Sequence, residues 1–96
     1  MKEQSTAELE SLAYCIVNGG CPKVGDKITV DARLGCEGPN NWSRWTFEAT
    51  AEQIKAGYEM AAKWEAQIAC SGSFGDEAKS RAARSSRFYL ATAATF

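Results

Sequence analysis

The sequence predicts an α+β fold, in which an antiparallel β-hairpin is covered by helices in the order α-β-β-α-α. Two stretches, about 27–34 and 42–49, alternate apolar and polar residues with period two, and a turn-rich segment separates them. Neighbouring side chains leave a strand on opposite faces, so this alternation is typical of a hairpin with one buried face. Apolar residues recur at helical spacing over three other stretches, about 6–18, 51–70 and 76–94.

Length and composition predict one globular domain spanning residues 1–96. The chain is 45% hydrophobic and 24% charged, which is typical of a folded domain with a single core. Its net charge of −1 excludes a strong attraction of the whole protein to nucleic acid or to an anionic membrane. The start lacks the basic and apolar segments of a signal peptide, and no stretch is long enough to span a bilayer. We therefore expect a cytoplasmic protein without a membrane partner.

The first helix has recognisable start and stop signals. Ser5 and Glu8 have the spacing of a capping box, in which each side chain bonds a backbone N–H at the helix start. Asn18-Gly19-Gly20 supplies residues that adopt the left-handed conformation closing a helix, and Pro22 prevents its continuation.

The charged residues of the hairpin predict its register. Placing Asp31 across from Arg44 puts charges together on one face and apolar residues together on the other. The same register pairs Lys27 with Glu48, Ile28 with Phe47 and Val30 with Trp45. A two-stranded sheet is marginal in water, so helices must cover it, or another strand must come from the carboxyl end or from a second copy. A homodimer is one way to meet this requirement.

The second and third helices are expected to be antiparallel neighbours joined by a short glycine- and serine-rich connection. Thr50 and Gln53 form a second capping box directly after the hairpin. Residues 87–96 fit either a helix or an edge strand, and we expect a helix because one face stays apolar without a breaker. The largest side chains, which we expect to supply much of the core, are Trp42, Trp45, Phe47, Tyr58 and Trp64.

The sequence lacks the residue patterns of common catalytic and metal-binding sites. The chain has no histidine, the usual general base and a common metal ligand. Its four cysteines lack a Cys-x-x-Cys pair, and its glycines form no phosphate-binding fingerprint. Cys21 and Cys36 could meet as a disulfide, although the expected compartment favours thiols. We therefore expect no enzyme, no metal and no cofactor.

Two surfaces are candidates for binding. Lys79, Arg81, Arg84 and Arg87 share one broad face of the last helix, which suits phosphates or an acidic protein surface. At the hairpin tip, Trp42 lies close to Arg44, and both residue types are enriched in protein-binding hot spots. Trp42 serves a partner if it is exposed and belongs to the core if it folds over the hairpin end.

These features favour a small non-enzymatic protein-binding module, an inhibitor or adaptor that occupies a partner's surface. Phage-encoded inhibitors of bacterial defence complexes are one class of small proteins with such traits, an analogy of class without a shared motif. The alternative is a nucleic-acid-binding module that uses the basic face of the carboxyl-terminal helix.

Overall fold

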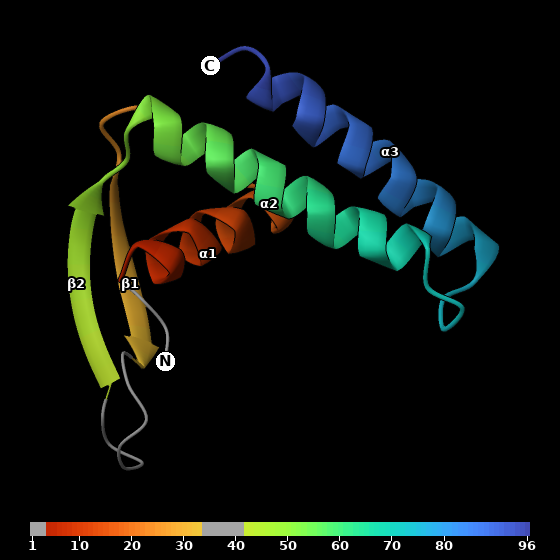
Figure 1. The fold of residues 1–96 in the computed structure, drawn as a ribbon, viewed down its shortest axis with the longest axis horizontal. Helices are drawn as coiled ribbons and strands as arrows, with labels where there is room; N and C mark the ends of the chain where they lie inside the picture. Colours follow the sequence, from red (N-terminus) through yellow and green to blue (C-terminus); the bar gives the residue numbers. More distant parts are fainter. Residues whose placement is uncertain (1–3, 34–41) are drawn as a thin grey trace.

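The computed structural model describes residues 4–33 and 42–96 and confirms the α+β fold (Figure 1). In this part of the chain the elements follow the predicted order, and every boundary lies within two residues of its expected place. The elements are α1 (Gln4–Val17), β1 (Lys27–Arg33), β2 (Trp42–Glu48), α2 (Ala51–Ala69) and α3 (Asp76–Ala93).

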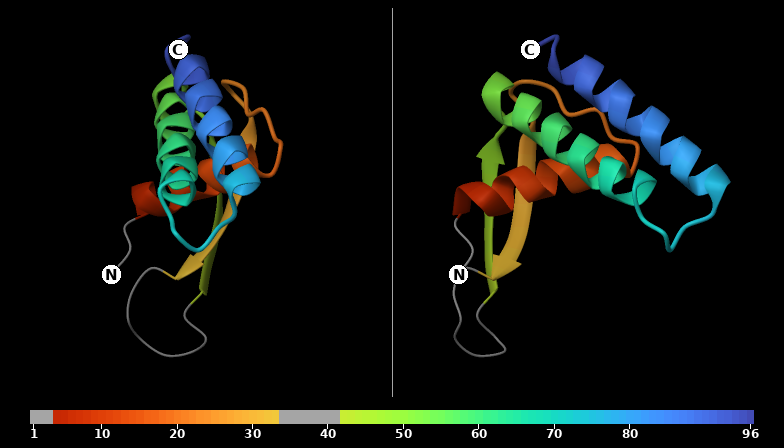
Figure 2. Two further views of the ribbon diagram at one scale, coloured as in Figure 1. Left: turned by 90° about the vertical axis from the view of Figure 1, so that its right-hand side faces the viewer. Right: turned by 45° about the vertical axis from the view of Figure 1, so that its right-hand side comes forward.

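The two strands pair antiparallel in the predicted register. Asp31 faces Arg44 and Val30 faces Trp45, so the charged pair lies on the outer face and the apolar pair on the inner face. Helix α1 lies against the inner face (Figure 2), where Ala7 packs with Val30 and half-buried Trp45. One helix therefore supplies most of the cover that the sheet requires.

The start of α2 is capped as predicted. The Thr50 side chain accepts a hydrogen bond from the backbone N–H of Gln53 at 3.2 Å, and the Gln53 side chain accepts one from the Thr50 backbone N–H at 3.0 Å. The capping box predicted at Ser5 is wrong, because α1 begins at Gln4 and Ser5 lies inside it. Serine is tolerated within a helix, so the helix extends past this residue.

The core is built from small and aliphatic side chains rather than from the large rings expected. Leu12, Ile16 and Ile54 are fully buried, and Tyr58 is the one large aromatic residue buried with them in the described part of the chain. The other predicted rings, Trp45, Phe47 and Trp64, are half-buried at the edge of the core, and the side chain of Trp42 lies outside the described part.

Gly57 explains why small residues prevail between α1 and α2. A Cβ atom added to this buried glycine would lie 3.0 Å from the Leu12 Cβ, which is tighter than ordinary contact. At this position the two helices therefore approach too closely for a larger side chain to fit between them.

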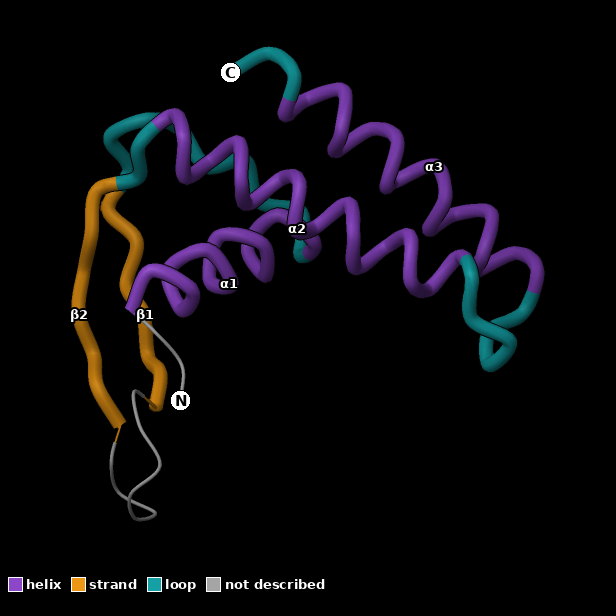
Figure 3. Tube along the Cα trace, in the orientation of Figure 1, coloured by secondary structure: helices purple, strands orange, loops and turns teal. Residues whose placement is uncertain are grey.

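Helices α2 and α3 form an antiparallel pair that extends away from the sheet (Figure 3). Small residues make part of their contact: Ala62 and Ala82 are buried, and the Ser86 hydroxyl donates a hydrogen bond to the Ala62 carbonyl at 2.9 Å. The chain remains helical to Ala93, which confirms a helix rather than a strand near the carboxyl end.

Candidate binding groove

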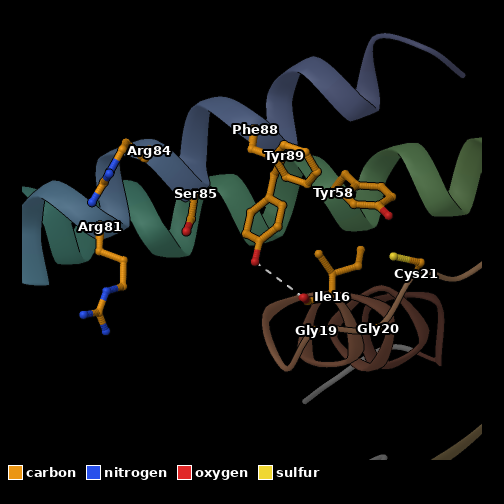
Figure 4. Close-up of a pocket in the computed structure, with 10 residues that line it drawn as sticks. All are labelled: Ile16, Gly19, Gly20, Cys21, Tyr58, Arg81, Arg84, Ser85, Phe88 and Tyr89. Atoms are coloured by element: carbon orange, nitrogen blue, oxygen red, sulfur yellow. Dashed lines mark hydrogen bonds between the residues drawn. The ribbon is translucent and has the colours of Figure 1, made fainter.

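A cavity of about 460 Å³ lies where the end of α1 and the turn after it face α2 and α3. We call it the α1–α3 groove. Its floor is formed by Ile16, Tyr58 and Tyr89 (Figure 4). Ile16 and Tyr58 are 2% and 6% exposed, and the rings of Tyr58 and Tyr89 lie 6.2 Å apart between centroids. The floor is therefore largely apolar and belongs to the core.

The two tyrosine hydroxyls give this floor its polar groups. The Tyr89 hydroxyl donates to the Ile16 carbonyl at 3.5 Å and so connects α3 to α1. Burial raises the pKa of both phenols above the ordinary value, and the nearby Cys21 thiol adds to the shift for Tyr58 while Glu65 adds to it for Tyr89. Both hydroxyls are consequently neutral near pH 7 and can donate hydrogen bonds.

One wall of the groove is the turn that follows α1. Gly19 has a φ of +94°, a conformation that side chains rarely adopt, and it lets the chain reverse directly after the helix. The Gly20 N–H then donates to the Cys15 carbonyl at 2.8 Å, and a Cβ on Gly20 would clash with the Cys15 sulfur. These two glycines bring the exposed Cys21 into the wall, facing Tyr58 (Figure 4).

The opposite rim comes from one face of α3. Arg81, Arg84 and Phe88 follow one another at helical spacings of three and four residues, so their side chains share that face. Phe88 is 65% exposed, the largest exposed fraction of any large apolar residue in the described part of the chain. The arginines lie at one end of the groove and Tyr58 and Cys21 at the other (Figure 4).

The rim arginines are weakly engaged within the protein. Arg81 approaches Glu77 at 3.7 Å, and both side chains are largely exposed. Arg84 has no ion pair with any residue that the structure describes. Exposed pairs of this kind contribute little to stability, so both guanidinium groups have hydrogen-bonding capacity left for a ligand.

The structure divides the basic face predicted on α3. Arg81 and Arg84 line the groove together with Ser85, whereas Lys79 and Arg87 are not part of its lining. Arg87 is exposed and Lys79 is half-buried. Two of the four predicted cations therefore belong to the groove, and the joint binding role of all four stays a prediction.

The described residues include only part of the second predicted surface, at the hairpin tip. The Arg44 guanidinium binds Asp31 through its Nη2 at 2.8 Å and its Nε at 3.1 Å. This contact holds the pKa of Asp31 below its ordinary value and raises that of Arg44. Arg44 is thus already partnered, while the Trp42 side chain and residues 34–41 lie outside the described part.

The described residues bring together no set of groups suited to metal binding. No cluster of three or more Cys, Asp or Glu side chains forms among residues 4–33 and 42–96. Cys15, Cys21 and Cys70 are unpaired thiols, whereas Cys36, and with it the predicted pairing with Cys21, falls in the segment that is not described. The groove offers donors, cations and apolar surface, which are groups for binding.

Sequence reasoning identified the two groove arginines and missed their aromatic neighbours. Tyr58, Tyr89 and the Gly19–Cys21 turn reach the groove through tertiary packing, which leaves no local pattern. Phe88 does give a local signal in the sequence, because it is an apolar residue one helical turn from Arg84, on a face predicted to be solvated.

Comparisons with known proteins identify no relative. No family model matches the chain, no curated protein matches it, and no solved structure matches its fold. None of the helices in the described part has the length and apolar character needed to cross a membrane. The groove and its chemistry are therefore the features of this chain that bear on its function.

Proposed function

We propose that this chain is a small non-enzymatic protein-binding module, an inhibitor or adaptor that occupies part of a partner's surface through the α1–α3 groove. The observation that carries this proposal is the exposed Phe88 ring, which shares one face of α3 with Arg81 and Arg84 at a groove with an apolar floor. Aromatic and arginine side chains around such a depression are typical of interface hot spots.

Phe88 supplies a reason for a partner to bind. Covering a phenylalanine side chain fully is worth about 1.5–3 kcal/mol, and this ring gains little of that within its own fold because it is 65% exposed. A partner that covers it gains part of this free energy, and the adjacent guanidinium groups add direction and specificity.

A nucleic acid is the second candidate partner, because an aromatic ring among cations also suits base stacking over a phosphate backbone. The groove supports it less well. It holds two guanidinium groups, and each phosphate neutralised on duplex DNA changes the salt dependence by a log–log slope of about −0.9. Lys79 and Arg87, which would extend the basic track, lie outside the lining.

Site-specific photo-cross-linking in the native host tests the proposed function. A benzophenone amino acid replaces Phe88 in one variant and Thr46, on the exposed outer face of the sheet, in a matched control. We expect a discrete protein adduct at position 88 that excess unmodified protein suppresses and that position 46 does not form. Components of bacterial defence complexes are one class of adduct to look for.

Binding of the purified adduct partner then completes the test. Saturable binding that weakens when Phe88 is replaced by alanine supports the proposal, and a fall in the partner's own activity distinguishes an inhibitor from an adaptor. Equal adducts at both positions, or adducts to nucleic acid alone at position 88, would contradict it.

A further inference from the structure

We infer that the α1–α3 groove binds a short extended peptide segment of its partner, with one large apolar anchor residue and a carboxylate two residues away. This inference rests on the proposed function and specifies the chemistry of the partner.

The apolar part of the groove calls for a single anchor side chain. The cavity of about 460 Å³ lies within the size range of small ligand sites. Tyr58 and Tyr89 offer ring faces on its floor, and Phe88 flanks it from the rim. One aromatic or large aliphatic side chain placed there would contact all three rings and cover part of Phe88.

The charged end of the groove calls for anions. Arginine pairs its planar fork with a carboxylate through two parallel hydrogen bonds. The Ser85 hydroxyl lies on the same rim and can donate a further bond. An acidic segment therefore complements this end, whereas a basic or purely apolar one does not.

The spacing along α3 relates the anchor to the anions. With a rise of about 1.5 Å per residue, Arg84 and Arg81 lie about 6 Å and 10 Å along the helix axis from Phe88. An extended peptide advances about 3.3 Å per residue and sends alternate side chains to opposite faces. A side chain two residues from the anchor therefore lies level with Arg84 and on the same face as the anchor, whereas the third residue points away from the groove. A helical ligand, with its shorter rise, would require about four residues to reach Arg84.

A displayed library of short random peptides tests this inference. The library is selected on the full-length protein and counter-selected on the variant carrying Arg81→Gln, Arg84→Gln and Phe88→Ala. All three side chains are exposed or on the rim, so we expect the variant to remain folded, and its thermal unfolding is measured as a check. The expected consensus is one large apolar residue with Asp or Glu two positions away.

Matched substitutions on α3 then locate the binding site. Fluorescence anisotropy of the consensus peptide should show Kd rising about fivefold or more for Arg84→Gln and for Phe88→Ala. Arg87→Gln removes the same charge, and Leu90→Ala removes an apolar side chain that is 52% exposed, both from α3 outside the groove lining. We expect these two controls to leave Kd unchanged.

The outcomes separate this inference from the proposed function. Selected peptides that lack carboxylates, that place them only four residues from the anchor, or that bind the triple variant equally well would overturn the inference. A single-stranded oligonucleotide that displaces the peptide at moderate salt would point to the nucleic-acid alternative. Failure to select any acidic consensus, together with a specific adduct at position 88, would reject the peptide chemistry alone. Failure of both experiments would reject both proposals.

Discussion

The outer face of the hairpin and the rim of the α1–α3 groove are both exposed and charged, yet they differ in how their polar groups are partnered. On the hairpin, Arg44 holds Asp31 through two of its nitrogens, and the hydroxyls of Thr29 and Thr46 lie 3.2 Å apart. On the rim, Arg84 has no ionic partner among the described residues, and the Phe88 side chain is 65% exposed. The polar groups of the first surface bind one another, whereas those of the second are left for the partner in the proposed function.

The contrast shows that side chains on the hairpin stabilise the fold, whereas those on the groove rim keep their capacity for binding. Cross-strand pairs contribute to the hairpin on which they lie and leave little capacity for a partner. Rim side chains that gain little within the fold retain their capacity until a ligand supplies the missing groups. The floor beneath the rim belongs to the core, however, so the groove depends on folding even where its rim does not contribute to it.

The largest expected effect is at that floor. Ile16→Ala removes a fully buried side chain, so we expect the free energy of unfolding to fall by about 2–5 kcal/mol in chemical denaturation. Ile16→Val, the matched smaller deletion, should cost about 0.5–1.5 kcal/mol. Equal stability of all three proteins would mean that the groove floor is independent of the core, and it would contradict the dependence of the groove on folding.

An intermediate effect is expected for the two groove tyrosines at alkaline pH. Their folded pKa values are raised, so the neutral phenols favour the folded state, and this contribution is fully present below the ordinary tyrosine pKa of about 10. It is lost as pH rises through the raised values. Near-ultraviolet titration of tyrosinate, with Tyr58→Phe and Tyr89→Phe to assign the steps, should show later ionisation in the folded than in the urea-unfolded chain.

Glu65→Gln sharpens that measurement, because it removes a carboxylate that contributes to the raised pKa of Tyr89. We expect the Tyr89 pKa to fall partway towards its ordinary value while that of Tyr58 stays raised. Coincident titration curves for the folded and unfolded proteins would contradict the burial of Tyr58 and the partial burial of Tyr89.

The smallest effect is expected on the hairpin. Because Arg44 lowers the folded pKa of Asp31, the ion pair favours folding above the ordinary carboxyl range and loses this effect as pH falls through the lowered value. Carboxyl NMR titration should show Arg44→Gln returning the Asp31 pKa towards its ordinary value. Arg84→Gln, an equal loss of charge on the groove rim, should leave it unchanged.

The same contrast explains what could be predicted from sequence. The hairpin register was predictable because alternation and one opposite-charge pair, Asp31 with Arg44, act over a short span and agree on both faces. The helix after it was predictable because its capping box is local. At the start of α1 a similar local signal at Ser5 failed, since capping residues are also tolerated inside a helix.

The groove was harder to predict from sequence because it is assembled from the end of α1, the middle of α2 and one face of α3. Its cations were visible as a basic face, but which of them meet an apolar floor depends on how α3 packs on α2. Alanine and serine at that contact, among them Ala82 and Ser86, determine this packing, and their small size gives a weak periodic signal.

Gly57 has a consequence for the selectivity of the groove. A methyl group at this position would press on Leu12 and would also lie 3.5 Å from the Ile16 Cδ1. Leu12 is fully enclosed and has little room to yield. The spacing between α1 and α2 thus depends on the absence of a side chain at Gly57, and under the proposed function this spacing also limits the size of side chain that the groove would accept.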